Sequence, residues 1–140
     1  MTYLLDLNYT LVANSERKRA PFSRQIEGET YRDELLQRLA GEKVILITAR
    51  PQNHREQTLD SIAAKTGWRP NAAFFNEYNL RPQHAKERIL RDEILPNWPG
   101  PFFGIESNPL TRAMYAKHGI DSQTWAQFLG VEDSGRVDVS

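Results

Sequence analysis

The sequence predicts an α/β fold, a Rossmann-like three-layer sandwich in which helices cover both faces of a mostly parallel central sheet. Two observations predict it. Short apolar runs without helical spacing alternate along the whole chain with helix-like stretches. The clearest run, Lys-Val-Ile-Leu-Ile-Thr at residues 43–48, has the continuous apolar pattern of a strand that is buried on both faces. Such strands occupy the centre of parallel sheets.

The first third of the chain supplies a strand and a helix before that central strand. Residues 2–6 form a short apolar run at the N-terminus and are predicted to be a buried strand. A polar, arginine-bearing stretch follows at residues 14–29. Residues 30–33, Thr-Tyr-Arg-Asp, resemble a capping box ahead of a helix that Gly41 ends.

The second half continues the alternation. The predicted helices there have clear end signals, with Gly67 and Gly119 as stops and Asn108 as a cap before Pro109. The predicted elements are a helix at 53–66, a strand at 72–75, a helix at 82–95, a strand at 101–105, a helix from Asn108 to Gly119 and a short strand at 123–125.

Length and composition limit the domain organisation and the class of protein. The 140 residues predict a single domain over 1–130, followed by a polar, flexible tail at 131–140. Eighteen Lys and Arg balance eighteen Asp and Glu, so the chain has no global positive field, and any polyanion contact must be local. The absence of cysteine excludes disulfide scaffolds and thiol nucleophiles. Without an apolar run of roughly 18 residues, we expect a cytoplasmic protein that makes no membrane contact.

Polar side chains follow the predicted strands where ligands of open α/β sheets bind. Asp6 follows the first strand, Thr48 the second, and Glu106 the fourth, while Lys86 lies in the intervening helix. Two carboxylates suit Mg²⁺, and a carboxylate can also attack phosphorus. Taken singly, each residue has a structural alternative as a turn former, strand end, solvated acid or exposed lysine.

These residues resemble the motifs of the haloacid dehalogenase (HAD) superfamily of phosphohydrolases over residues 2–128. The four motifs match at residues 4–12 (Leu-Leu-Asp-Leu-Asn-Tyr-Thr-Leu-Val), 45–48, Lys86 and 103–108 (Phe-Gly-Ile-Glu-Ser-Asn). The resemblance implies a HAD-like fold and a Mg²⁺ cofactor. It makes Asp6 the nucleophile and a metal ligand, the Asn8 carbonyl and Glu106 further ligands, and Thr48 and Lys86 the phosphate-binding residues. It further predicts that Thr10, Ala49 and Arg50 contact the substrate.

Within the superfamily, the chain looks most like the phosphatase half of phage-type polynucleotide kinase-phosphatases. The shared residues are Thr48-Ala49-Arg50, 86–89, 104–107, and Gly119-Ile120 before Trp125. No phosphate loop of a kinase occurs. The intervals between motifs leave no room for a cap module, so the site should be open to bulky substrates. The fork of Arg50 suits phosphate oxygens, and the basic cluster at 16–19 with Arg24 either attracts a phosphate backbone or is simply solvated.

Two positions depart from the family pattern. Asn8 stands where the family has the Asp that protonates the leaving group, and Glu106-Ser107 replaces the common acidic pair. An amide cannot transfer that proton, and general acid-base help is typically worth about 10²–10⁴ in rate. Two hypotheses remain. One is a Mg²⁺-dependent phosphohydrolase on phosphate monoesters, including 3′-phosphorylated nucleic-acid ends or nucleotides. The other is a catalytically impaired module that binds a phosphorylated ligand or a protein partner.

Overall fold

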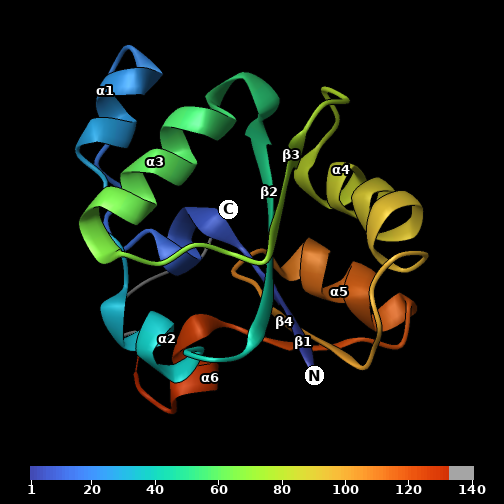
Figure 1. Cartoon of the computed structure of the whole chain (residues 1–140). Helices are drawn as coiled ribbons and strands as arrows, with labels where there is room; N and C mark the ends of the chain where they lie inside the picture. Colours follow the sequence, from blue (N-terminus) through green and yellow to red (C-terminus); the bar gives the residue numbers. More distant parts are fainter. Residues whose placement is uncertain (133–140) are drawn as a thin grey trace.

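The computed structural model describes residues 1–132 and places their five strands in one sheet (Figure 1). The spatial order is β3-β2-β1-β4-β5, and every pair is parallel. The parallel sheet between helical layers confirms the predicted fold class. The strands are β1 (Thr2–Leu5), β2 (Lys43–Pro51), β3 (Ala72–Asn76), β4 (Phe102–Ile105) and β5 (Asp121–Gln123).

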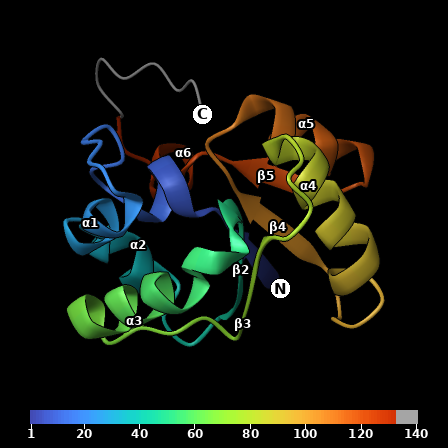
Figure 2. The ribbon, with the colours of Figure 1, turned by 90° about the horizontal axis from the view of Figure 1, so that it is seen from above.

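Helices cover both faces of the sheet, as Figure 2 shows from above. One face carries α1 (Phe22–Glu27), α2 (Asp33–Arg38), α3 (Arg55–Thr66) and α6 (Trp125–Leu129). The other carries α4 (Pro82–Ile89) and α5 (Pro109–Lys117). Three short turns complete the described chain: η1 (Leu7–Leu11), η2 (Gln52–His54) and η3 (Leu90–Ile94). None of the helices within residues 1–132 is long and apolar enough to cross a membrane.

The core consists of two apolar layers, one on each face of the sheet. Alternate residues of a strand point to opposite faces, so Leu5 joins the layer beneath α2 and α3, whereas Leu4 joins the layer beneath α4 and α5. On β2, Leu46 and Ile45 divide in the same way. All four side chains are fully buried, and each stabilises the fold by about 1.5–3 kcal/mol. The central strands are therefore fixed from both sides.

A glycine on β4 brings α5 close to the sheet. A Cβ atom on Gly104 would lie 2.9 Å from the ring of Tyr115, which is too short for a real contact. The helix begins next to the strand end, where the side chain of Asn108 accepts a hydrogen bond from the backbone N–H of Leu110 at 2.9 Å. This confirms the predicted cap and fixes the chain directly after Glu106.

In the first half, one helix was not predicted and one predicted feature was wrong. The polar stretch at 14–29 contains α1, whose buried Ile26 supplies too short an apolar pattern to indicate a helix. The capping box at 30–33 does not form, because the backbone N–H of Thr30 donates to the Asn14 side chain at 2.8 Å and Tyr31 forms a bridge with Val12. The helix α2 therefore begins at Asp33 without a side-chain cap.

Further differences concern the second half. The strand predicted at 123–125 ends at Gln123, because Thr124 forms a capping box with Gln127 and Trp125 starts α6. The helix predicted at 82–95 ends at Ile89 and continues as the wider turn η3. Most of the predicted tail at 131–140 lies outside the described residues.

Candidate active site

The carboxyl ends of β1, β2 and β4 meet above the sheet around a small pocket of about 60 Å³. A water-sized probe needs roughly 10–15 Å³ of such space, so the pocket has room for a few small polar groups. Six predicted site residues line it together with three others. The lining residues are Asp6, Asn8, Thr48, Ala49, Lys86 and Glu106, with Pro82, Ser107 and Asn108.

Asp6 is buried at the floor of the pocket and is held by four hydrogen-bond donors. Its Oδ1 accepts from Lys86 Nζ at 2.8 Å. Its Oδ2 accepts from the hydroxyls of Thr10 and Ser107, both at 2.8 Å, and from the Ser107 backbone N–H at 3.3 Å. The carboxylate is thus oriented and desolvated before any ligand arrives.

Lys86 joins the two carboxylates of the site. Its Nζ also lies 2.6 Å from Glu106 Oε1, and the other oxygen of Glu106 accepts from the backbone N–H of Asn108 at 3.0 Å. All three charged side chains are at least 94% buried. Lys86 reaches the pocket from α4 because Pro82 starts that helix and the aliphatic stem of the lysine packs into the protein.

The three groups shift one another's ionisation. Burial raises the pKa of Asp6, but the charge of Lys86 and the surrounding hydrogen bonds outweigh it and leave that pKa below its usual value. For Glu106, burial and the charge of Asp6 together raise the pKa. Burial lowers the pKa of Lys86, and the two carboxylates reverse this and raise it. The site therefore holds an ionised Asp6 and a charged Lys86, together with a Glu106 carboxyl that retains its proton more readily than usual.

The turn after β1 brings Asn8 to the pocket. This segment, η1, is not a regular helix, because Asn8 is extended (φ −65°, ψ 137°) and Tyr9 adopts the left-handed region at φ 60°. The backbone N–H of Tyr9 donates to the Ser15 hydroxyl at 2.8 Å, which holds the turn. The carbonyl of Asn8 lies 3.3 Å from the Ser107 hydroxyl and faces the site.

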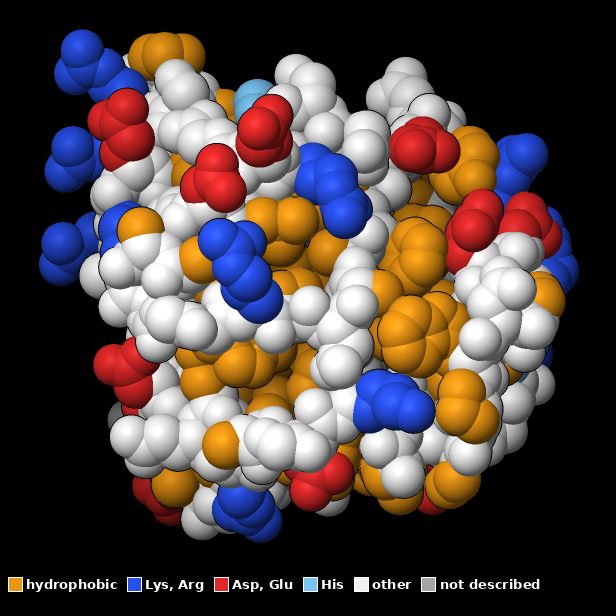
Figure 3. Space-filling model, in the orientation of Figure 1, with side chains coloured by type: hydrophobic (Ala, Val, Ile, Leu, Met, Phe, Trp, Pro, Cys, Tyr) orange, Lys and Arg blue, Asp and Glu red, His pale blue; other side chains and the backbone are white. Residues whose placement is uncertain are grey.

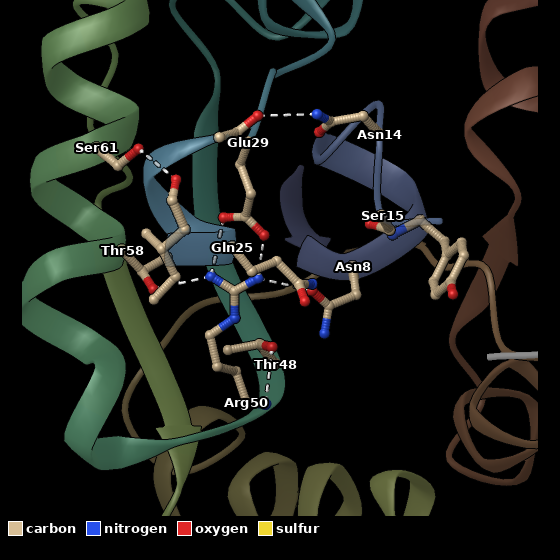
Figure 4. A network of polar contacts seen from close by, with 12 residues as sticks. Asn8, Asn14, Ser15, Gln25, Glu29, Thr48, Arg50, Thr58 and Ser61 are labelled. Atoms are coloured by element: carbon tan, nitrogen blue, oxygen red, sulfur yellow. Dashed lines mark hydrogen bonds and ion pairs between the residues drawn. The ribbon is translucent and has the colours of Figure 1, made fainter. Parts of the chain in front are cut away.

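Arg50 lies outside the pocket, in a network with Glu29 (Figure 4). Its guanidinium donates to both carboxylate oxygens of Glu29, at 3.1 and 2.6 Å, and to the Thr58 hydroxyl at 2.9 Å. It also donates to the side-chain oxygen of Asn8 at 2.8 Å. Its backbone N–H donates to Thr48 Oγ1 at 3.0 Å.

Two predicted substrate contacts are thus displaced from the pocket. Thr10 is buried behind Asp6, and the fork of Arg50 is turned toward Glu29. Their direct contact with substrate stays a prediction. Sequence reasoning did not find Glu29, because an isolated acidic residue in a polar stretch carries no signal that it meets an arginine 21 positions away. The convergence of Ser107 on Asp6 also depends on the fold.

The oxygen donors of the pocket fit a hard divalent cation. The carboxylates of Asp6 and Glu106, the carbonyl of Asn8 and the hydroxyl of Ser107 converge there, and Mg²⁺ prefers such oxygen ligands. Within residues 1–132, no group of three or more acidic, His or Cys side chains forms a candidate metal cluster. A cation here would rely on two carboxylates together with neutral oxygens and water.

The predicted basic cluster lies on the surface next to this site. Arg17, Lys18, Arg19 and Arg24 are all exposed, and basic side chains gather at the edge of the molecule beside α1 (Figure 3). Lys18 Nζ lies 4.9 Å from the ring centroid of Tyr9, which connects the cluster to the turn that bears Asn8.

Comparisons with known proteins identify the fold. No protein-family model matches the sequence, and no curated protein is a detectable relative. Among solved structures, chains of the Pnkp1/Rnl/Hen1 RNA repair complex and of a second Pnkp1/Rnl/Hen1 complex are similar, with TM-scores of 0.73 and 0.71 and identities of 18% and 19%. Both matches cover 88% of this chain but only 41% and 45% of the other, so the chain spans less than half of their length.

A third structure is the HAD domain of the effector protein Lem4 from Legionella pneumophila. Its TM-score is 0.50 at 10% identity, with 92% of this chain and 91% of that chain covered. At such identities the likeness shows the fold. The chain has a HAD-like fold, as the resemblance of its motifs predicted.

Proposed function

We propose that this HAD-like chain is a Mg²⁺-dependent phosphohydrolase that acts on phosphate monoesters through an aspartyl-phosphate at Asp6. The observation that carries the proposal is the position of Asp6. It is an ionised carboxylate at the end of the central strand, in a pocket with one ammonium group and further oxygen ligands. A buried carboxylate with a lowered pKa is available as a nucleophile at neutral pH.

The reaction has two displacements at phosphorus. In the first, a carboxylate oxygen of Asp6 forms a bond to phosphorus, and the ester oxygen leaves with the electron pair. In the second, water attacks the acyl-phosphate, which releases inorganic phosphate and restores the carboxylate. Lys86 holds positive charge next to the reacting group, and Thr48 offers a hydroxyl in the lining of the pocket.

Magnesium would be held by the carboxylates of Asp6 and Glu106 and by the carbonyl of Asn8. When bound, the ion supplies positive charge that offsets the charge of the phosphoryl group. The surplus acceptor charge of the pocket, expressed in the raised pKa of Glu106, supports this assignment.

Turnover should be slow with poor leaving groups. Asn8 lines the pocket where the family pattern has an acid, and an amide gives no proton to a departing oxygen. Esters of acidic alcohols, such as aryl phosphates, need that proton least and should react fastest.

For the natural substrate, we propose 3′-phosphorylated nucleic-acid ends or nucleotides. The exposed basic cluster beside Tyr9 supports this, because it offers local positive charge on a chain with no net charge. The fold shared with chains of an RNA repair complex is consistent with it.

The test is phosphate release in the presence of Mg²⁺ from an aryl phosphate and from oligonucleotides phosphorylated at the 3′ or 5′ end. Wild type should release phosphate, EDTA should stop it, and Asp6→Asn should lower it by about 10³-fold or more. Asp60→Asn, an exposed change on α3, serves as the matched control. If neither wild type nor Asp6→Asn releases phosphate from any of these substrates, the proposed phosphohydrolase activity is refuted.

The second candidate is a binding module for phosphorylated ligands, favoured by the amide of Asn8 and by Ser107. It predicts that inorganic phosphate or a phosphorylated oligonucleotide binds with micromolar to millimolar affinity, measured by calorimetry, without turnover. Loss of binding in Lys86→Met would place the ligand in the same pocket.

A further inference from the structure

We propose that Arg50 and Glu29 are positioning residues that hold the side-chain amide of Asn8 with its nitrogen toward the pocket. Residue 8 then donates a hydrogen bond to a phosphoryl oxygen of the substrate instead of transferring a proton. The inference rests on the proposed function and specifies how its unusual residue works.

The orientation of Asn8 follows from the chemistry of its partner. A guanidinium has only N–H donors and no acceptor, so the group facing it must be the amide oxygen. The Nη2 of Arg50 lies 2.8 Å from Asn8 Oδ1. The amide nitrogen therefore points away from Arg50, as Figure 4 shows. Because Asn8 also lines the pocket, we infer that this nitrogen faces it.

Arg50 is itself held in place. Its side chain is fully buried, and its two terminal nitrogens make four hydrogen bonds: two to Glu29, one to Thr58 and one to Asn8. The ring of Phe22 lies 4.9 Å from the guanidinium carbon. Glu29 comes from the loop before α2 and Thr58 from α3, so three separate segments fix the arginine. Such a bidentate pair permits little rotation.

In this arrangement Arg50 has no accessible donor for the substrate, so the positioning role proposed here replaces the predicted direct contact. The remaining donor, Nε, is buried, without a partner and out of reach of solvent. A phosphate would have to displace Glu29 from a pair that is closed to water, and breaking such a pair is costly. The side chain of Arg50 can therefore influence the reaction only through Asn8, since its other partners, Glu29 and Thr58, lie outside the pocket.

The arrangement gives residue 8 the opposite polarity to that of a carboxylate. An Asn side chain presents a donor to the pocket, whereas an Asp would be kept ionised by Arg50 and would present acceptors. The donor stabilises negative charge on the phosphoryl group, and one such hydrogen bond is typically worth 10²–10³ in rate in a water-excluded site. This pocket is open on one side, so we expect about 10-fold.

The experiment is a double-mutant cycle between residues 50 and 8, measured by steady-state hydrolysis of an aryl phosphate in Mg²⁺. Arg50→Lys should lower kcat about 10-fold at unchanged KM, and Glu29→Gln should act in the same direction. In an Asn8→Ala background, neither change should have a further effect on kcat. Arg69→Lys, an exposed arginine remote from the network, is the matched control. Circular dichroism and thermal unfolding verify that each variant is folded.

The opposing outcomes are specific. A raised KM in Arg50→Lys that persists in Asn8→Ala would mean that Arg50 binds substrate, and an unchanged kcat would mean that it positions nothing. Either result overturns the proposal.

A measurement on the wild type alone covers the case in which the variants do not fold. In a ¹⁵N NMR spectrum, the side-chain NH₂ signal of Asn8 should shift when inorganic phosphate is added. It should shift even if no substrate is turned over, which separates this inference from the proposed activity. An unmoved signal with phosphate bound would refute it.

Discussion

Two clusters of buried charge lie side by side in this molecule and differ in one respect. The Lys86 cluster (Asp6, Lys86, Glu106) has two carboxylates for one cation and lines the pocket. The Arg50 cluster (Arg50, Glu29) has one carboxylate for one cation and lies outside the pocket, closed to solvent.

The difference separates two uses of buried charge. The balanced pair has its partners inside the protein and can only fix geometry. The unbalanced cluster keeps an excess of acceptors, and this excess is what a cation or a proton from outside can satisfy. Asn8 links the two clusters, because its side chain accepts from Arg50 and its carbonyl lies next to the Ser107 hydroxyl, which donates to Asp6.

Removing the cation of the unbalanced cluster should have the largest effect. Lys86→Met leaves two buried carboxylates facing each other, and we expect a loss of about 3–5 kcal/mol in the free energy of unfolding at pH 7, measured with urea. The loss should shrink as the pH falls, because protonation of Asp6 and Glu106 removes the negative charge that Lys86 compensates. Lys43→Met, at an exposed lysine on β2, is the control. An unchanged midpoint for Lys86→Met would show that the charges are not in contact.

Changing the residue that links the clusters should come next. Asn8→Asp introduces a carboxylate beside Arg50. This carboxylate can take a proton from the attacking water. We expect turnover of an aryl phosphate to rise by about 10²-fold, the low end of general acid-base help, because Arg50 keeps the new group ionised and weakens it as an acid. Asn53→Asp, an exposed change on η2, should leave the rate unchanged. A lower rate for Asn8→Asp would show that the amide donor matters more than the lost base.

A change in the packing of α5 against β4, which lies beside the clusters, should have a smaller effect. Gly104→Ala forces a methyl group to within 2.9 Å of the Tyr115 ring, so α5 must move away from β4. We expect a loss of about 1–3 kcal/mol in the free energy of unfolding by urea titration. In Gly28→Ala the new methyl group meets ordinary contacts at 3.7 Å and should change little. If Gly104→Ala is as stable as wild type, the packing between α5 and β4 adjusts without a measurable loss of free energy.

The smallest effect concerns an exposed charge cluster, which the comparison predicts to be weak. Hydrogen bonds from Lys117 and His118, both at 2.7 Å, lower the pKa of Glu87 to about 2. A lowered folded-state pKa stabilises the protein above the unfolded value, about 4.5, and this contribution is lost as the pH falls toward 2. The melting temperature of wild type should exceed that of Glu87→Gln slightly at pH 6 and equal it near pH 2. A difference that grows on acidification would contradict this.

How much of the fold and of the site the sequence predicts depends on how far apart in the sequence the interacting residues lie. The convergence of Asp6, Thr48 and Glu106 is predictable, because the ends of parallel strands meet at one edge and each strand has a clear local pattern. The roles of these residues in catalysis stay predictions. The helix caps at Asn108 and Gly67 are local and were also predictable.

Contacts between distant segments could not be predicted in this way. Arg50 has the fork that suits phosphate, and nothing in its neighbours indicates that Glu29 already occupies that fork. The capping box at residues 30–33 failed for the same reason, because Asn14, far upstream, takes the Thr30 backbone N–H. Local patterns give way where a distant polar side chain offers a better partner.

The central position of β1 has a consequence for how the molecule fluctuates. This strand is hydrogen-bonded on both edges and carries Asp6 at its end, so we expect the segment that holds the Asp6 carboxyl to open only when the whole sheet comes apart. In a deuterium-exchange experiment its amides should belong to the slowest class, while the exposed loops around it should exchange quickly. The loops around the sheet can therefore rearrange without displacing the Asp6 carboxyl.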